Sequence, residues 1–285
     1  MYKIGLSASK SFDESYFKEC ELAGIGAMEI SCNTSGYEAL DFEAVKKRAD
    51  AHNVELWSLH LPFDSEEKAN PSSPDKQVRD STIAYFSGII KKATEIGIKI
   101  FVVHANCSEP VEEDSKRKLR IAYAKETLDA LARVADSFGA VIAVENLPRT
   151  CLGRNSDEIL ELTGANSKLK ICYDTNHLLE QDAVEFIKAV GDKIITIHVS
   201  DYDFVNERHW LPGEGKNDWQ GIIKALKEIG YSGVWMYEIG FECPVTIIRD
   251  RNLNCNDFVK NANELFENKP ITTFSVHKEN LGMWE

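Results

Sequence analysis

Short apolar runs alternate along the chain with longer segments of mixed polarity. Eight runs rich in Ile, Val and aromatic residues have the length and alternation of strands: residues 2–7, 27–32, 55–60, 99–104, 141–146, 170–174, 194–199 and 234–239. The segments between them show helical spacing of apolar residues, among them 13–24, 41–52, 75–96, 112–138, 182–191 and 219–230. The pattern therefore predicts alternating strands and helices.

Strict alternation favours parallel strands joined by right-handed crossovers. Eight such units within 285 residues predict an α/β fold, a closed (β/α)8 TIM barrel formed as a single domain by residues 1–267. Residues 268–285 are left as a C-terminal tail outside the eight units. An open doubly wound sheet is the alternative, but its dinucleotide-binding form would carry a GxGxxG turn after the first strand, and GLSASK at 5–10 is not one.

Residues able to bind a metal stand at the C-terminal ends of six predicted strands: His60, His104, Glu145, Asp174, His198 and Glu238. Active sites of TIM barrels form at this end. Several carboxylates facing one barrel mouth would repel each other and lose hydration, so a bound cation explains them most simply. We therefore predict a divalent metal site, for Mn, Mg, Co or Zn, formed by Glu145, Asp174, His198 and Glu238.

Two-residue alternation predicts which side chains share the inward face with these ligands. Glu145 should share it with Ala143 and Val141, Glu238 with Met236 and Val234, and His198 with Thr196 and Ile194. Trp57, three residues before His60, has the opposite parity, so we expect it to pack against a helix. Glu29 on the second strand is open to two interpretations, a carboxylate that supports the ligands or a structural group.

Loops after the strands add further candidates. His177 follows Asp174 by three residues, and Arg208 and His209 precede a Pro-Gly-Glu-Gly turn at 212–215. From local sequence alone, a plain turn and a solvated surface charge are equally good interpretations of PGEG and Arg208. Phe63 and Trp210 are candidates for the apolar wall of a sugar site.

Composition narrows the class of substrate. Lys and Arg number 33 against 46 Asp and Glu, a net charge of -13, which argues against binding nucleic acid or an anionic membrane. The start MYKIGLSAS lacks a signal-peptide core and no apolar stretch reaches about 18 residues, so a cytoplasmic protein is expected. Seven scattered cysteines without CxxC spacing predict reduced thiols.

These motifs resemble the xylose isomerase-like barrels. That superfamily includes sugar and sugar-phosphate isomerases and epimerases, inosose dehydratase, hydroxypyruvate isomerase and the DNA-repair endonuclease IV. The resemblance extends over nearly the whole chain and rests on VVH at 102–104, VEN at 144–146, DTNH at 174–177, HVSD at 198–201, RHWLPGEG at 208–215 and Glu238.

The resemblance implies roles for individual residues. In the ketose 3-epimerases the metal is held at the positions of Glu145, Asp174, His198 and Glu238. The two glutamates also move the proton there, and the positions of His177 and Arg208 contact the substrate. We add His209, Phe63 and Trp210 to the expected substrate contacts.

Endonuclease IV carries a larger metal cluster. Its three zinc ions also use the positions of His60, His104, His177 and His209, together with an aspartate where this chain has Glu207. Retention of His60 and His104 therefore permits a second metal here.

The resemblance implies a metal-dependent sugar isomerase or epimerase that works through an enediolate, with Glu145 and Glu238 as acid and base. An inosose-dehydratase-like lyase, an endonuclease IV-like zinc phosphodiesterase and a sugar-binding barrel without turnover are the alternatives. The expected partner is a small carbohydrate, with neither nucleic acid nor membrane, and a homo-oligomer is compatible with the sequence.

Overall fold

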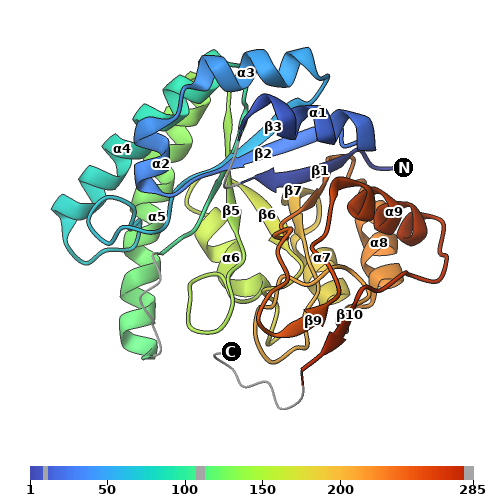
Figure 1. The fold of residues 1–285 in the computed structure, drawn as a ribbon. Coiled ribbons are helices and arrows are strands. Elements are labelled where there is room, and N and C mark those ends of the chain that lie inside the picture. Colours follow the sequence, from blue (N-terminus) through green and yellow to red (C-terminus); the bar gives the residue numbers. More distant parts are fainter. Residues whose placement is uncertain (9–11, 107–112, 279–285) are drawn as a thin grey trace.

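The computed structural model describes residues 1–8, 12–106 and 113–278. Eight parallel strands form a closed barrel in chain order, with β8 paired to β1 (Figure 1). They are β1 Ile4–Ala8, β2 Ala27–Ser31, β3 Glu55–His60, β4 Ile100–Val103, β5 Val141–Glu145, β6 Lys170–Asp174, β7 Ile194–Val199 and β8 Trp235–Tyr237. The predicted TIM barrel is confirmed, with strand bounds within two residues of the expected ones.

Helices surround the barrel on its outer side (Figure 1). They are α1 Glu14–Ala23, α2 Thr34–Ala39, α3 Phe42–Ala51, α4 Lys76–Glu95, α5 Asp114–Ser137, α6 Ser156–Thr163, α7 Ala183–Val190, the 3-10 turn η1 Gly191–Lys193, α8 Trp219–Glu228 and α9 Cys255–Phe266. Most begin at an Asp or Asn whose side chain accepts a backbone N–H of the first turn, as Asp13 does for α1 and Asn155 for α6.

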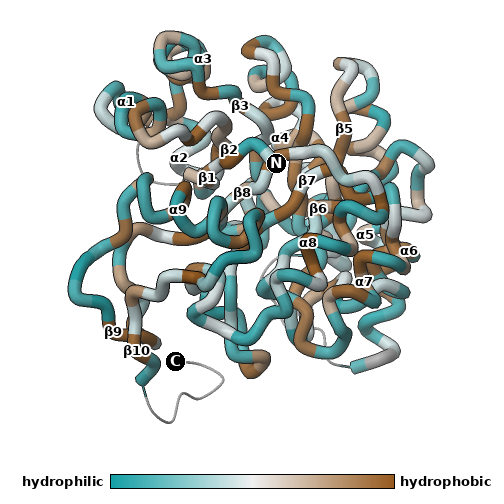
Figure 2. Tube along the Cα trace, turned by 90° about the vertical axis from the view of Figure 1, so that its right-hand side faces the viewer, coloured by the Kyte–Doolittle hydropathy of each residue, from teal (hydrophilic) through white to brown (hydrophobic). Residues whose placement is uncertain are grey.

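The core has two layers. Apolar side chains on the outer face of the strands pack beneath the helices, among them Ile142, Val144, Ile197, Trp235 and Tyr237. The barrel interior holds two small clusters, Ala27 with Val234 and Met236, and Val102 with Ala143 and Cys172. Figure 2 shows hydrophobic and hydrophilic residues alternating along the helices that surround the barrel. The inward faces predicted from Glu145 and Glu238 are confirmed by Ala143 and Met236.

A bulge in β3 overturns the prediction for Trp57. The pairing of β2 with β3 shifts between Met28 and Glu29, which leaves Trp57 as an extra residue. Its ring packs on the inner cluster of Ala27 and its Nε1 donates to Thr196 Oγ1 at 3.1 Å. Packing of Trp57 against a helix was therefore a wrong prediction.

A second bulge lies in β7. The pairing with β6 shifts between Ile171 and Cys172, and Ile195 becomes the extra residue that packs on the inner cluster. Ile194 belongs to the helix-facing core instead, so its predicted place on the face of His198 was wrong. Both bulges precede the strand ends and leave His60 and His198 pointing inward.

The C-terminal part of the chain adds a small antiparallel sheet beside the barrel (Figure 1). It pairs β9 Ile247–Arg249 with β10 Ser275–His277. The described part of the predicted tail, up to residue 278, thus contributes a strand, and residues 279–285 lie outside the described part of the chain.

The described ranges contain neither a disulfide nor a helix that could span a membrane. The six cysteines there form no disulfide, whereas Cys107 lies outside these ranges. Every helix in them is too short or too polar to span a bilayer.

Candidate metal and substrate site

Four predicted ligands converge at the C-terminal end of the barrel. Glu145, Asp174, His198 and Glu238 each offer a ligand atom, and these atoms all lie within 4.8 Å of one another. The first two end β5 and β6, His198 lies next to the end of β7, and Glu238 follows β8 directly. Glu145, Asp174 and His198 are buried, and Glu238 is partly exposed. The structure therefore brings the predicted ligand set together.

The atoms of this group fit a cation. Asp174 Oδ2 and His198 Nδ1 are buried and have no hydrogen-bond partner among the described residues. His198 Nδ1 lies 3.4 Å from Glu145 Oε1, 3.6 Å from Glu238 Oε2 and 3.9 Å from Asp174 Oδ2. Buried polar atoms are rarely left unpaired because each one costs about 1–3 kcal/mol. Three carboxylates and one imidazole around such atoms form a donor set suited to a divalent metal ion.

Glu29 of β2 supports the His198 ring. Its carboxylate is fully buried and accepts from Ser7 Oγ at 2.9 Å and from Ser58 Oγ at 2.7 Å. Its Oε1 lies 2.9 Å from His198 Nε2, an ion-pair distance at an angle outside hydrogen-bond geometry. A carboxylate beside the far nitrogen orients a metal-binding imidazole. The geometry favours the supporting role over the purely structural one for Glu29.

Glu29→Gln is expected to weaken Mn²⁺ binding by about 10–100-fold, the usual effect of losing such a partner of a histidine ligand. Isothermal titration of the metal-free protein measures it. Glu55→Gln is the matched control, because Glu55 starts the neighbouring strand and pairs with Lys3 at the surface. Equal affinities of Glu29→Gln and wild type would show that Glu29 does not support the metal site.

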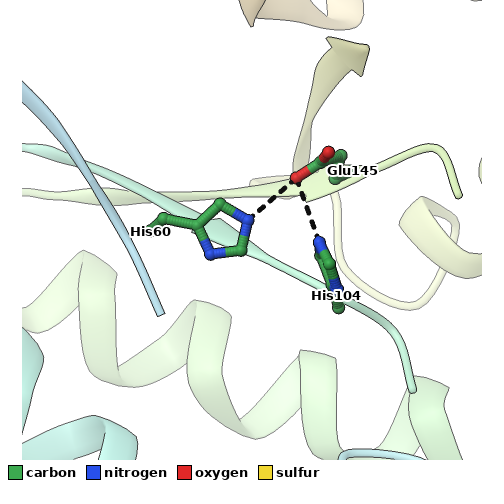
Figure 3. A group of neighbouring side chains, drawn as sticks. All are labelled: His60, His104 and Glu145. Carbon is green, nitrogen blue, oxygen red and sulfur yellow. Dashed lines mark hydrogen bonds and ion pairs between the residues drawn. The ribbon is translucent and has the colours of Figure 1, made fainter. Parts of the chain in front are cut away.

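His60 and His104 both point to the same oxygen of the Glu145 carboxylate (Figure 3). Their Nε2 atoms lie 3.0 Å and 3.4 Å from Glu145 Oε2. His60 Nδ1 lies 2.8 Å from the Leu61 carbonyl oxygen and its Nε2 is hydrogen-bonded to the Glu145 carboxylate, and because both partners accept, a metal ion bound here would take the place of the Nε2 proton. The ligand atoms of the three residues lie within 4.8 Å of one another. The pair predicted for a second metal therefore shares Glu145 with the first group.

A third group joins His177, Glu207 and His209. His177 Nε2 lies 3.1 Å from Glu207 Oε2, so glutamate at position 207 reaches the histidine. Nδ1 of His177 donates to the Asn146 carbonyl and Nδ1 of His209 to the Glu238 carbonyl, both at 2.9 Å. Each ring is thereby oriented with its Nε2 available to the group.

The two buried carboxylates of the group formed by Glu145, Asp174, His198 and Glu238 differ in the direction of their pKa shift. Burial disfavours charge on Glu145, but the nearby His198 and His104 outweigh it and hold the pKa of Glu145 well below its usual range. Burial raises the pKa of Asp174 to about 7, and although His177 opposes this rise, the charges of Glu238 and Glu145 add to it. One carboxylate therefore lacks charge compensation in the metal-free chain, which a divalent ion would supply.

These groups open into a cavity of about 270 Å³. Of the predicted substrate contacts, Phe63, His177 and His209 line it. The Phe63 ring stacks on His104 with 4.2 Å between ring centroids. Lining residues that the sequence did not single out are Asn106, Leu147, Pro148, Arg149 and Cys151, and Glu207 entered only through the family resemblance. Their one sequence signal was their place in the loops that follow β4, β5 and β7.

Trp210 does not contact this cavity, which corrects its predicted role. Its ring is fully buried, its Nε1 donates to Thr246 Oγ1 at 2.9 Å, and it stacks on His277. The reason is a backbone bridge between Asp201 and Trp210, which turns the ring toward the C-terminal segment.

Arg208 is buried beside the site. Its Nε donates to Asp203 Oδ2 at 2.9 Å, and it is not among the residues that line the described cavity. Its predicted contact with the substrate stays a prediction.

The fold and site define a TIM barrel with carboxylate and histidine side chains gathered at the C-terminal ends of its strands. A family model described as xylose isomerase-like TIM barrel matches residues 17–252. The chain belongs to this family, as its motifs suggested.

Known proteins resemble the chain over most of its length. An uncharacterised protein of Methanocaldococcus jannaschii is 27% identical over 286 residues, covering 96% of this chain and 92% of that protein. D-psicose 3-epimerase of Ruminiclostridium cellulolyticum is 22% identical over 227 residues, covering 76% of this chain and 75% of the epimerase. The crystal structure of a D-tagatose 3-epimerase-like protein has a TM-score of 0.74 and 24% identity, covering 93% of this chain and 97% of that one. This structural likeness shows the shared fold.

Proposed function

We propose that the protein is a metal-dependent isomerase or epimerase of a small carbohydrate. One observation carries the proposal: Glu145 and Glu238 belong to the same group of candidate ligands, although they come from strand ends three positions apart in the barrel. The similarity to a D-psicose 3-epimerase, a sugar epimerase by name, supports this choice of substrate class.

The metal-binding residues and the two glutamates have distinct roles in the proposed reaction. When bound by Glu145, Asp174, His198 and Glu238, a divalent ion supplies Lewis-acid polarisation of a substrate carbonyl. One glutamate removes the proton from the carbon beside the carbonyl, which gives an enediolate, and the other returns a proton from a different side. The low pKa of Glu145 keeps it ionised at neutral pH, which is the form that can bind a cation or accept a proton.

The cavity walls bind and orient the sugar. The Phe63 side chain is 40% exposed and offers an apolar surface to the C–H face of a sugar ring. His177 and His209, which also line the cavity, supply polar contacts, with Arg208 as the neighbouring cation. Together these side chains hold the reacting carbon next to the two glutamates.

The test is a panel of ketoses and aldoses incubated in D₂O with protein loaded in turn with Mn²⁺, Mg²⁺, Co²⁺ or Zn²⁺. We expect one sugar to be interconverted with its isomer or epimer and to gain deuterium at the carbon beside the carbonyl, detected by NMR. A product that has lost water would favour the lyase. Sugar binding without exchange or turnover would favour the non-catalytic barrel.

Three of the four candidate ligand groups among the described residues favour a second candidate, a zinc phosphodiesterase of the endonuclease IV kind. Glu145 belongs both to the first group and to the group with His60 and His104, and the third group lies beside them around His177. The net charge of -13 opposes binding of DNA. Three zinc ions per chain together with cleavage of abasic-site DNA would replace the isomerase proposal.

A further inference from the structure

We propose that Arg249 and Glu214 are positioning residues for the loop that carries Glu207 and His209. The C-terminal segment from β9 to β10 would then be part of the active-site machinery, although it lies outside the eight barrel units. The kinetic part of this inference rests on the proposed function, whereas its hydrogen-exchange part does not.

Arg249 and Glu214 form an enclosed ion pair. Both side chains have 0% exposure, and Arg249 Nη2 donates to Glu214 Oε2 at 2.6 Å. The same carboxylate oxygen accepts the backbone N–H of Leu211 at 3.1 Å. A buried ion pair is weak evidence for stability because desolvation offsets its attraction, but it imposes one geometry on the groups it joins. The guanidinium on β9 therefore fixes the turn at 211–214 from its outer side.

Other contacts join the same turn to the C-terminal segment. Asn261 Nδ2 of α9 donates to the Pro212 carbonyl at 2.8 Å, and the His277 ring of β10 contacts the Glu214 carbonyl oxygen. Gly213 has a φ of +93°, and a Cβ atom there would come within 2.7 Å of Ile271 Cγ2. The segment packs so closely on the turn that only glycine fits.

The barrel holds the turn from its inner side. Asp201 Oδ2 accepts the Gly213 N–H at 2.8 Å and the Trp219 Nε1–H at 2.9 Å, while Asp201 Oδ1 accepts the Asn217 N–H at 3.1 Å. The turn is thus held on one side by Asp201 of the barrel and on the other by Arg249 of the C-terminal segment.

The turn continues directly from His209, which lines the cavity. His209 has a φ of 51°, a left-handed conformation that a non-glycine residue keeps only where its surroundings enforce it. Asn176 Oδ1 accepts the backbone N–H of Arg208 at 3.0 Å on one side of this residue, and Glu214 holds Leu211 on the other. Release of the Arg249 contact would weaken the anchor at Leu211, leave the Asp201–Trp210 backbone bridge as the main restraint on this side, and let Glu207 and His209 shift.

The experiment compares Arg249→Met with Arg249→Lys and with Arg133→Met in the full chain. Arg133 is the control, since it is an arginine outside the C-terminal segment that pairs with Asp129 on α5 at 2.6 Å. We expect Arg249→Met to raise hydrogen exchange across residues 207–215 and to lower kcat/KM by about 10–100-fold, since a misplacement of about 1 Å can cost that much. Arg249→Lys should recover part of both effects, and Arg133→Met should match wild type.

A fall in melting temperature alone, with kcat/KM and exchange at 207–215 unchanged in Arg249→Met, would overturn the proposal. If Arg249→Met does not fold, Glu214→Gln takes its place, because it keeps an acceptor for Leu211 while removing the charge. Unchanged exchange in folded Glu214→Gln would then overturn the proposal as well. If wild type turns over no sugar, the proposed function fails, but the exchange comparison still decides this inference.

Discussion

Glu145→Gln and Glu238→Gln are each expected to lower turnover by about 10²–10⁴-fold, the usual contribution of a positioned acid or base. An amide keeps the shape of the carboxylate and one oxygen ligand, but it cannot take up or return a proton. The measurement is kcat for the sugar found in the substrate panel, with the metal content of each variant determined by mass spectrometry.

Metal content decides how a loss of activity is interpreted. Glu145 belongs to more than one candidate metal group, so Glu145→Gln tests proton transfer only where metal is retained. Hydrogen exchange in D₂O also shows which glutamate removes the proton and which returns it. The variant that lacks the returning group should still exchange the proton that the other glutamate removes, so the starting sugar should gain deuterium. Glu228→Gln, a half-exposed carboxylate at the end of α8, is the control. Undiminished turnover in both active-site variants would rule out the assigned roles.

The barrel was predictable because each strand is a short apolar run and each crossover a longer amphipathic one. The two bulges were not. An extra residue at Trp57 or Ile195 depends on pairing with the neighbouring strand, which alternation within one segment does not reveal. The two-residue alternation therefore failed only at or before the bulges, at Trp57 and Ile194, while His60 and His198 after them faced inward as expected.

The ligands could be predicted more readily than the cavity walls. Glu145, Asp174 and His198 lie within strands, so closure of the barrel alone brings them together. Loop residues follow paths set by distant contacts. Trp210 was misplaced because its loop turns back on Asp201 and packs on a sheet of two three-residue strands, which are too short to show a pattern.

Removal of the metal by a chelator is expected to abolish turnover and to lower the melting temperature. Without an ion, Asp174 Oδ2 and His198 Nδ1 stay buried and unpaired, and three carboxylates face one another. A ligand at 100 times its Kd stabilises the folded state by about 2.7 kcal/mol, which for a chain of this size corresponds to roughly 4–5 °C. Thermal denaturation with EDTA, then with Mn²⁺, Mg²⁺, Co²⁺ or Zn²⁺ restored separately, measures both effects.

Asp174→Asn separates metal binding from general stability. It removes a buried carboxylate whose charge is uncompensated in the metal-free chain, so the metal-free variant should melt no lower than metal-free wild type and should gain little from added metal. The number of ions that restores the melting temperature of the wild-type protein indicates how many groups bind metal. One ion fits the group of Glu145, Asp174, His198 and Glu238. More than one ion would extend binding to His60 and His104 or to His177, Glu207 and His209. Turnover and melting temperature that both survive in protein shown to be metal-free would contradict the metal site, because the buried carboxylates would then be stable without a counter-charge.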